Sequence, residues 1–452
     1  MQPIASTYTR ATLVAIAAAA LFALSPLSAV CGLAMVMMTR RAVASCEGAE
    51  RRWVGGALVI GIGLRGLCVL GVFLLTGREE QFNVLFGDGR FAVDRSIWIL
   101  NNVSGVPIAP FYWMRVSQNY GDVEYHYGLA AVQWLFGPSP YALSLINVAC
   151  FEAFAIIFHR LTRAAFGATA AAATLTLVLF WPTMFVWSFS MLKESVQFAL
   201  AIAAIAGTVW CVRGRRPTER LGYGIGIVIA LVVLTELRPG SSLMAAAAIV
   251  FGLAAYVATR RAWIATFSVV VAIVAGSVIA SRPSVQARAL AETRLALVRH
   301  VGHVKSTGIS YRASDERFYR GERLVPYSMN AREGARFLIL SAWYFFAAPL
   351  PPHIASTTGR LFIPLQLAWY ALLALAVIGI PSSFRRDSLV TWLAIGYLLA
   401  GLATIAPNSG NIGTLIRHRD MIVPFVMCLS SVGLTTVLAA FSLESDLSYA
   451  SD

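Results

Sequence analysis

The sequence predicts an all-α fold, a polytopic transmembrane helix bundle of about 11–13 spans whose external loops carry short helices. Of its 452 residues, 58% are hydrophobic and only 13% are charged, whereas a soluble domain carries about 25% charged residues. The apolar residues gather in runs of about 20, the length that crosses a bilayer. The longest polar stretches, 77–126 and 282–335, are too short for a large soluble domain, so we expect one integral membrane domain over 1–452.

The predicted spans follow these apolar runs in order. The first run reaches Met38 and is longer than the apolar core of a signal peptide, so we expect it to be retained as a helix. The runs cover 12–38, 54–76, 139–158, 167–187, 195–212, 221–237, 241–258, 262–281, 361–380, 388–406 and 420–440.

Short arginine-rich loops orient the predicted bundle. Basic loops after alternate spans are expected to face the cytoplasm. The loop with Arg385 and Arg386 joins this side only if the run 336–350 re-enters the membrane without crossing it, so we expect re-entry. The loops that this orientation places outside are 77–126, 282–335 and 407–418.

The external segment 282–335 is basic, although external loops usually carry few cations, and long loops obey that rule only weakly. Helical spacing predicts a helix over 284–305 that could lie on the membrane surface. Its apolar side would carry Val285, Leu290, Leu297 and Val301.

The placement of the positive charge argues against nucleic-acid binding, and the spacing of the cysteines argues against a disulfide framework or a zinc site. A net charge of +14 would favour nucleic acid in a soluble protein. Here the arginines cluster at the ends of apolar runs, as membrane topology requires, so the expected partner is the lipid bilayer and no nucleic acid is expected. The six cysteines show no CxxC or Cys/His spacing, so neither a disulfide framework nor a zinc site is predicted.

The first candidate site opens the loop 77–126. Transfer of a group from a phosphate carrier to a hydroxyl needs a base, and cations or a divalent metal ion for the leaving phosphate. Asp88 and Asp94 offer carboxylates, and Arg90 and Arg95 offer cations. Asp88 lies between two glycines and is expected on a turn before a helix begins. No other cofactor is indicated, and a solvated loop of mixed charge is the alternative.

Two further clusters combine polar and aromatic residues at the predicted external face. The stretch from Asp122 to Tyr127 contains Glu124 and His126, a composition that suits carbohydrate binding but also an interfacial aromatic belt. The very short loop Ser190–Ser195 contains Lys193 and Glu194. This lysine could contact a lipid phosphate, or it could snorkel beside a capping glutamate.

Two tight segments near the later spans also carry charged residues. Arg238 and Glu236 lie in a short turn, where they could line the same cavity as Asp88 or merely cap helices. In the stretch 408–420, glycines allow close backbone approach. Its basic members could bind a phosphate or could simply flank a helix; they are Arg417, His418 and Arg419.

Two charges fall inside predicted spans, Arg65 in 54–76 and Glu152 in 139–158. Charges within the bilayer are rare and are usually paired or functional. Because the two spans run antiparallel and the residues could share a depth, we predict that they form an ion pair.

Several of these stretches resemble parts of a known class of enzymes. They are Phe86-Gly87-Asp88-Gly89-Arg90, Trp181-Pro182 followed by Ser190–Ser195, and Asn411–Thr414 followed by Arg417-His418-Arg419 and Pro424. They resemble the GT-C class of integral membrane glycosyltransferases, in particular bacterial family 39-like enzymes that use polyprenyl-phosphate sugars. The resemblance covers most of the chain loosely. It departs in one respect, because the acidic loop follows the second apolar run and not the first.

The resemblance implies an inverting glycosyltransferase of the bacterial cytoplasmic membrane that acts on its outer face. It would move a sugar from a polyprenyl-phosphate donor to a glycan, lipid or protein acceptor of the cell envelope. Asp88 would be the base, supported by Asp94 or Glu124. Lys193, Arg417 and Arg419 would hold the carrier phosphate. The expected substrate-binding set is completed by Arg90, His126, Glu194 and His418.

Two alternatives remain open. A surface-polysaccharide polymerase or ligase would use external arginines, which the segment 282–335 and Arg417 with Arg419 supply. A transporter or lipid flippase would use an intramembrane pair such as Arg65 with Glu152, at a site near the bilayer midplane.

Overall fold

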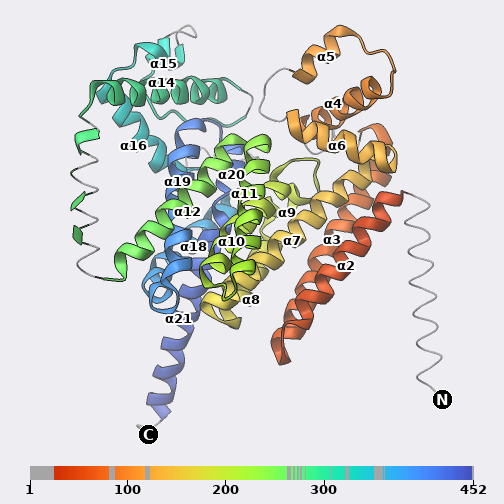
Figure 1. Cartoon of the computed structure of the whole chain (residues 1–452). Coiled ribbons are helices and arrows are strands. Elements are labelled where there is room, and N and C mark those ends of the chain that lie inside the picture. Colours follow the sequence, from red (N-terminus) through yellow and green to blue (C-terminus); the bar gives the residue numbers. More distant parts are fainter. Residues whose placement is uncertain are drawn as a thin grey trace, which may run out of the picture. The chain divides into compact units, whose positions relative to one another are not determined.

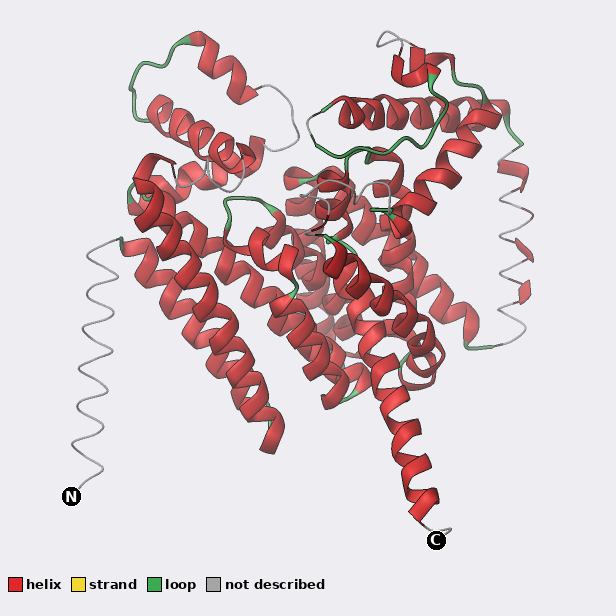
Figure 2. Cartoon of the chain, turned by 180° about the vertical axis from the view of Figure 1, so that it is seen from behind, coloured by secondary structure: helices red, strands yellow, loops and turns green. Residues whose placement is uncertain are grey.

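The computed structural model of the chain is built from α-helices (Figure 1). It describes residues 25–80, 87–117, 123–261, 266–267, 270–271, 274, 277–279, 281–306, 308–320, 325–350, 360 and 362–449. Over these residues no β-strand forms, as Figure 2 shows, and Ser310 with Asn411 makes an isolated bridge. The predicted all-α fold is confirmed.

The chain divides into two compact units. Unit 1 comprises Met1–Leu161 and Leu175–Ser242, and unit 2 comprises Thr162–Thr174 and Leu243–Asp452. The helices of unit 1 are α2 (Pro26–Ala44), α3 (Gly48–Glu80), α4 (Gly87–Val103), α5 (Pro110–Ser117), α6 (Val123–Phe136), α7 (Pro140–Phe166), α9 (Pro182–Phe189), α10 (Glu194–Arg213) and α11 (Pro217–Leu237).

Helix α8 (Ala168–Phe180) contributes residues to both units, the last residues of α7 belong to unit 2, and the first residues of α12 (Pro239–Thr259) belong to unit 1. The helices of unit 2 are α12, α14 (Pro283–Lys305), α15 (Arg317–Arg320), η1 (Val325–Ser328), α16 (Ala331–Ala347), α18 (Ile363–Arg386), α19 (Ser388–Ile405), η3 (Ala406–Asn408), α20 (Ile412–Arg419) and α21 (Val423–Tyr449).

Proline marks where many of these helices begin. A proline in the first turn costs no hydrogen bond, because the first N–H groups of a helix have no partner inside it. Helix α16 begins differently, with a capping box in which Asn330 accepts from the backbone N–H of Glu333 and the Glu333 side chain accepts in return. The prolines in first turns include Pro26, Pro182, Pro217 and Pro283.

Nine helices within the described residues are long and apolar enough to cross a bilayer, and the pair α8 and α9, bent by 61°, adds a tenth candidate. The chain is therefore an integral membrane protein. The predicted span 262–281 lies mostly outside the described residues, and 12–38 is described only from Ser25. Helix α16, which contains most of the run 336–350, is not among these span-length helices.

The predicted ion pair between Arg65 and Glu152 is wrong. The Arg65 guanidinium donates to Ser188 Oγ and to the carbonyls of Gly61 and Leu179. Glu152 Oε1 instead accepts from Thr39 Oγ1 at 2.6 Å. Uncharged acceptors thus satisfy the buried cation without a carboxylate. The Arg65 side chain also lies over two aromatic rings, those of Phe151 and Phe185.

Helices α18 and α21 of unit 2 pack backbone against backbone through two glycines. A Cβ added to Gly379 would overlap the carbonyl oxygen of Leu429, and one added to Gly433 would overlap the carbonyl oxygen of Leu375. Small residues allow such approach in membranes, where van der Waals packing drives helix association.

We expect Gly379→Ala to lower the free energy of unfolding by about 1–3 kcal/mol, because the new methyl group forces the two backbones apart. Thermal unfolding in detergent would measure this loss. Gly226→Ala on α11 is the matched control, since a Cβ there meets nothing within 4 Å. Equal midpoints for Gly379→Ala and Gly226→Ala would contradict this packing.

Candidate functional site

A short turn between α9 and α10 forms the centre of the candidate site in unit 1. Buried Asn147 on α7 donates from its side-chain amide to the carbonyl oxygens of Ser190 at 2.5 Å and of Leu192 at 2.9 Å. The Ser190 hydroxyl donates to the carbonyl of Trp187 at 2.8 Å. These bonds give partners to carbonyls at the end of α9 and in the turn after it. A carbonyl without a partner is costly in an apolar setting.

This turn presents a buried lysine and a buried glutamate side by side in sequence. Lys193 Nζ donates to the carbonyl of Leu237 at 2.9 Å, and both Lys193 and Glu194 are buried. Glu194 lies in the first turn of α10, where the helix dipole stabilises a carboxylate. The predicted snorkelling alternative for Lys193 is therefore wrong, because its ammonium is held inside the protein.

Arg238 follows α11 and faces the same turn. Its Nη1 lies 3.8 Å from Glu194 Oε1 and donates to Gln197 Oε1 at 3.3 Å. Its side chain is about a quarter exposed, at 23%, while that of Glu194 is fully buried, at 0%. Lys193, Glu194 and Arg238, together with the carbonyl of Leu237, thus form one polar cluster, which we call the Lys193 cluster.

The first turn of α4 adjoins the Lys193 cluster. A Cβ at Gly89 would lie 3.6 Å from Met191 Cβ, so the backbone next to Asp88 packs directly on the turn. Asp88 lies within α4 and not on a turn before it, which corrects the prediction for this residue. Asp88 is exposed, whereas Gly89 beside it is buried against this turn.

The other acidic candidates of unit 1 lie along α4 and α6, which pack side by side (Figure 1). Asp94 Oδ2 lies 3.5 Å from Arg90 Nε, one helical turn away, and burial raises the pKa of Asp94 against the opposing effect of that arginine. On α6, Glu124 is exposed and His126 is buried. Asp122 lies outside the described residues.

Three buried polar atoms at the starts of α10 and α12 make no hydrogen bond within the described part of the chain. They are Ser195 Oγ, Gln197 Nε2 and Ser241 Oγ. Ser195 and Gln197 follow Glu194 in the first turn of α10, and the backbone N–H of Ser241 donates to the carbonyl of Arg238 at 2.9 Å. Such atoms are uncommon in folded proteins and usually have water or a ligand as partner. Sequence spacing gave no signal for them.

In unit 2, the stretch 408–420 is covered by α14 and the chain that follows it. His300 Nδ1 lies 2.5 Å from the carbonyl oxygen of Ser409, and the Tyr311 hydroxyl donates to the same oxygen at 2.7 Å. His303 Nδ1 lies 2.7 Å from the carbonyl oxygen of Asn408. The helix predicted over 284–305 is confirmed, and Leu297 and Val301 on its apolar side are buried in a cluster with Phe318 and Phe337. The C-terminal part of this side thus packs on protein, whereas Val285 near the start of the helix is exposed.

Arg419 is bonded within the protein, and the predicted phosphate clasp with Arg417 stays a prediction. Its guanidinium is buried, donates to the carbonyl of Ala348 at 3.0 Å and to Gln366 Oε1 at 3.3 Å, and lies over the ring of Trp369. Burial lowers its pKa to about 10, so it remains charged at neutral pH. Arg417 and His418 are half-buried, and His418 Nδ1 lies 3.4 Å from Ser409 Oγ. Arg419 therefore positions α20, and the other two remain candidates.

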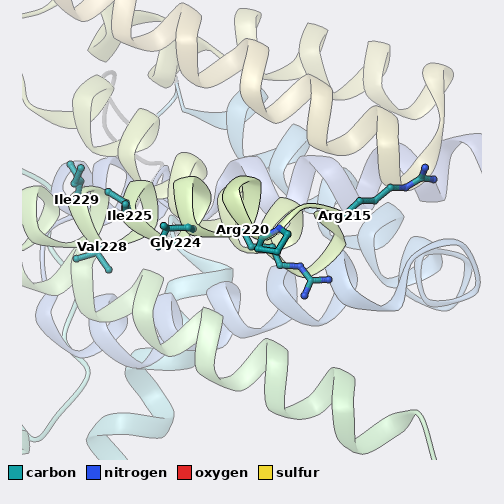
Figure 3. Close-up of a pocket in the computed structure, with 8 residues that line it drawn as sticks. Arg215, Arg220, Gly224, Ile225, Val228 and Ile229 are labelled. Carbon is teal, nitrogen blue, oxygen red and sulfur yellow. The ribbon is translucent and has the colours of Figure 1, made fainter.

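A groove of about 790 Å³ runs along α11 (Figure 3). Leu221, Ile225, Val228 and Ile229 line it, and Arg215 and Arg220 lie at one end. Apolar walls with cations at one end suit a lipid chain and its headgroup better than a sugar.

Comparison of the chain with protein-family models, with curated proteins and with solved structures found no match. The candidate site is therefore argued from its geometry alone.

The buried histidine of unit 2 gives a prediction for acid stability. Burial lowers the pKa of His300 from 6.5 to about 4. Between these values the unfolded chain binds a proton that the folded protein does not, so stability is present above pH 6.5 and is lost as the pH falls toward 4. The loss is on the order of 3 kcal/mol. We expect His300→Gln to flatten the dependence of the unfolding midpoint on pH in this window, and an unchanged slope would contradict the assignment.

Proposed function

We propose that the protein is a membrane glycosyltransferase that moves a sugar from a polyprenyl-phosphate donor to a glycan, lipid or protein acceptor of the cell envelope. The observation that carries the proposal is the packing of the first turn of α4, which bears Asp88, on the turn that bears buried Lys193 and Glu194. The reaction needs a carboxylate as base and a cation for the leaving phosphate, and these two turns supply one of each.

In this proposal Asp88 accepts the proton of the acceptor hydroxyl, whose oxygen attacks the anomeric carbon of the sugar. The bond between that carbon and the phosphate oxygen breaks, and the carrier phosphate leaves with the electron pair, so the anomeric configuration inverts. Lys193 and Arg238 stabilise the charge on the leaving phosphate. Asp94 and Glu124 support the acceptor side, and the polar atoms of Ser195, Gln197 and Ser241 suit a polar substrate.

The outer face of a bacterial cytoplasmic membrane is the proposed location. The arginine-rich loops support the outer face, because such loops are expected to face the cytoplasm and the Lys193 turn and the first turn of α4 lie at the opposite ends of the predicted spans. The assignment to a bacterial membrane rests on the resemblance to the GT-C class.

A polysaccharide polymerase is the second candidate, and it would use a convergence of external arginines. Among the described residues, several arginines of the basic segment instead bond acidic side chains. Arg312 and Arg320 bond Glu316, and Arg317 bonds Glu333. Arg336, just after the segment, bonds Asp315. Arg417 and His418 are the half-buried basic residues that favour this candidate. The transporter alternative loses its main support, because Arg65 and Glu152 have separate partners.

We expect Asp88→Asn to reduce glycan transfer by roughly 10²–10⁴-fold, because general base catalysis contributes about that much. Complementation of a strain that lacks the protein, with lipid-linked and surface glycans as readout, would measure this loss. Glu292→Gln, which neutralises an exposed acid on α14, is the control that should retain activity.

Arg417→Ala separates the two candidate enzymes. For the transferase centred on Asp88, activity should fall much less in Arg417→Ala than in Asp88→Asn, with equal amounts of each variant in the membrane. Normal glycan in Asp88→Asn together with loss in Arg417→Ala would overturn the transferase and favour the polymerase.

A further inference from the structure

The turn between α2 and α3 brings together three side chains that no sequence motif connects. Cys46 follows α2, Glu50 lies in the first turn of α3, and His159 lies near the end of α7. Their ligand atoms, a thiol sulfur, a carboxylate oxygen and a ring nitrogen, all lie within 4.8 Å of one another. Cys46 and His159 are each only 3% exposed, so they are held in place by the surrounding protein.

Local geometry explains why these side chains meet. Gly48 has a φ of +53°, a left-handed conformation that lets the chain reverse between the two helices at little cost. Cys46 and Glu50 are four residues apart across this reversal. Helix α7 supplies the third side chain, with His159 Nε2 3.7 Å from Glu50 Oε1, a distance longer than a hydrogen bond. Arg160, the next residue on α7, donates to the carbonyl of Arg41 at 3.3 Å. This bond links α7 to the end of α2, just before the turn.

We propose that Cys46, Glu50 and His159 bind a divalent transition-metal ion, with Zn²⁺ as the expected occupant. Thiolate, imidazole and carboxylate are the three protein ligands of Zn²⁺, and three of them leave a fourth position for water. Tetrahedral Zn²⁺ with Zn–S of about 2.3 Å and Zn–N of about 2.0 Å places its ligand atoms about 3.5 Å apart. Side-chain adjustments of about an ångström therefore close the cluster around an ion.

The mixed donor set also argues against other ions. Ca²⁺ and Mg²⁺ take oxygen ligands, and neither binds a thiolate well. The zinc site that sequence spacing did not predict is assembled from two segments more than 100 residues apart, 46–50 and 159. It is separate from the Lys193 cluster and does not depend on the proposed sugar transfer. Its structural effect would be to fasten the turn between α2 and α3 to α7.

Binding of Co²⁺, a spectroscopic substitute for Zn²⁺, tests this site in the purified full-length protein in detergent after removal of metal. We expect one Co²⁺ per chain, a thiolate-to-cobalt charge-transfer band, visible bands of a tetrahedral ion, and displacement by Zn²⁺. Cys46→Ser should abolish the charge-transfer band, and His159→Gln should weaken binding at least tenfold. Cys211→Ser, which removes a cysteine at the end of α10, is the matched control and should bind as the parent does.

Absence of the band in the parent protein, or its persistence in Cys46→Ser, would overturn the proposal. If Cys46→Ser does not fold, the unfolding midpoint gives a second measurement. Zn²⁺ should raise the midpoint of the parent protein and of Cys211→Ser but not that of His159→Gln. Equal shifts in the parent protein and in His159→Gln would also overturn the site.

Discussion

The candidate site of unit 1 depends on the side-chain amide of Asn147. A chain that leaves one apolar helix and enters another exposes carbonyls without helical partners, and at membrane depth no water replaces those partners. Buried Asn147 donates to two of these carbonyls, those of Ser190 and Leu192. The backbone can therefore turn between α9 and α10, and this turn sets Lys193 and Glu194 against Leu237 and Arg238.

Burial gives the charges of this site their chemical character. Lys193 and Glu194 are buried in the protein. Charges interact more strongly in the protein interior than at a surface exposed to water. Asp88 on the adjoining helix is exposed and can meet an acceptor that arrives from outside the protein. A buried cation for the leaving phosphate and an exposed base for the acceptor are the two requirements of the proposed transfer. The basic segment of unit 2 differs, because several of its arginines form ion pairs with acidic neighbours.

The sequence predicted the helices well and their polar partners poorly. Most apolar runs became span-length helices, because a helix is the way for a single segment to satisfy its own backbone in lipid. Partners far apart in sequence left no such periodic signal. Arg65 was expected to meet Glu152, yet it found Ser188 and two carbonyls, which no pattern of charges could indicate. For the same reason, Cys46 and His159 could not be linked by spacing, and Arg419 could not be recognised as a residue that holds α20 in place.

The most direct test of the central claim is equilibrium binding of a short-chain polyprenyl phosphate to the purified protein and to Lys193→Met. Lys305→Met is the matched control, because Lys305, at the end of α14, is the other lysine of the chain. A carrier-phosphate site at the Lys193 cluster predicts at least tenfold weaker binding for Lys193→Met and unchanged binding for Lys305→Met, since a charged hydrogen bond is worth about 1.5–3 kcal/mol. Equal affinities of the parent protein and of a folded Lys193→Met variant would contradict it.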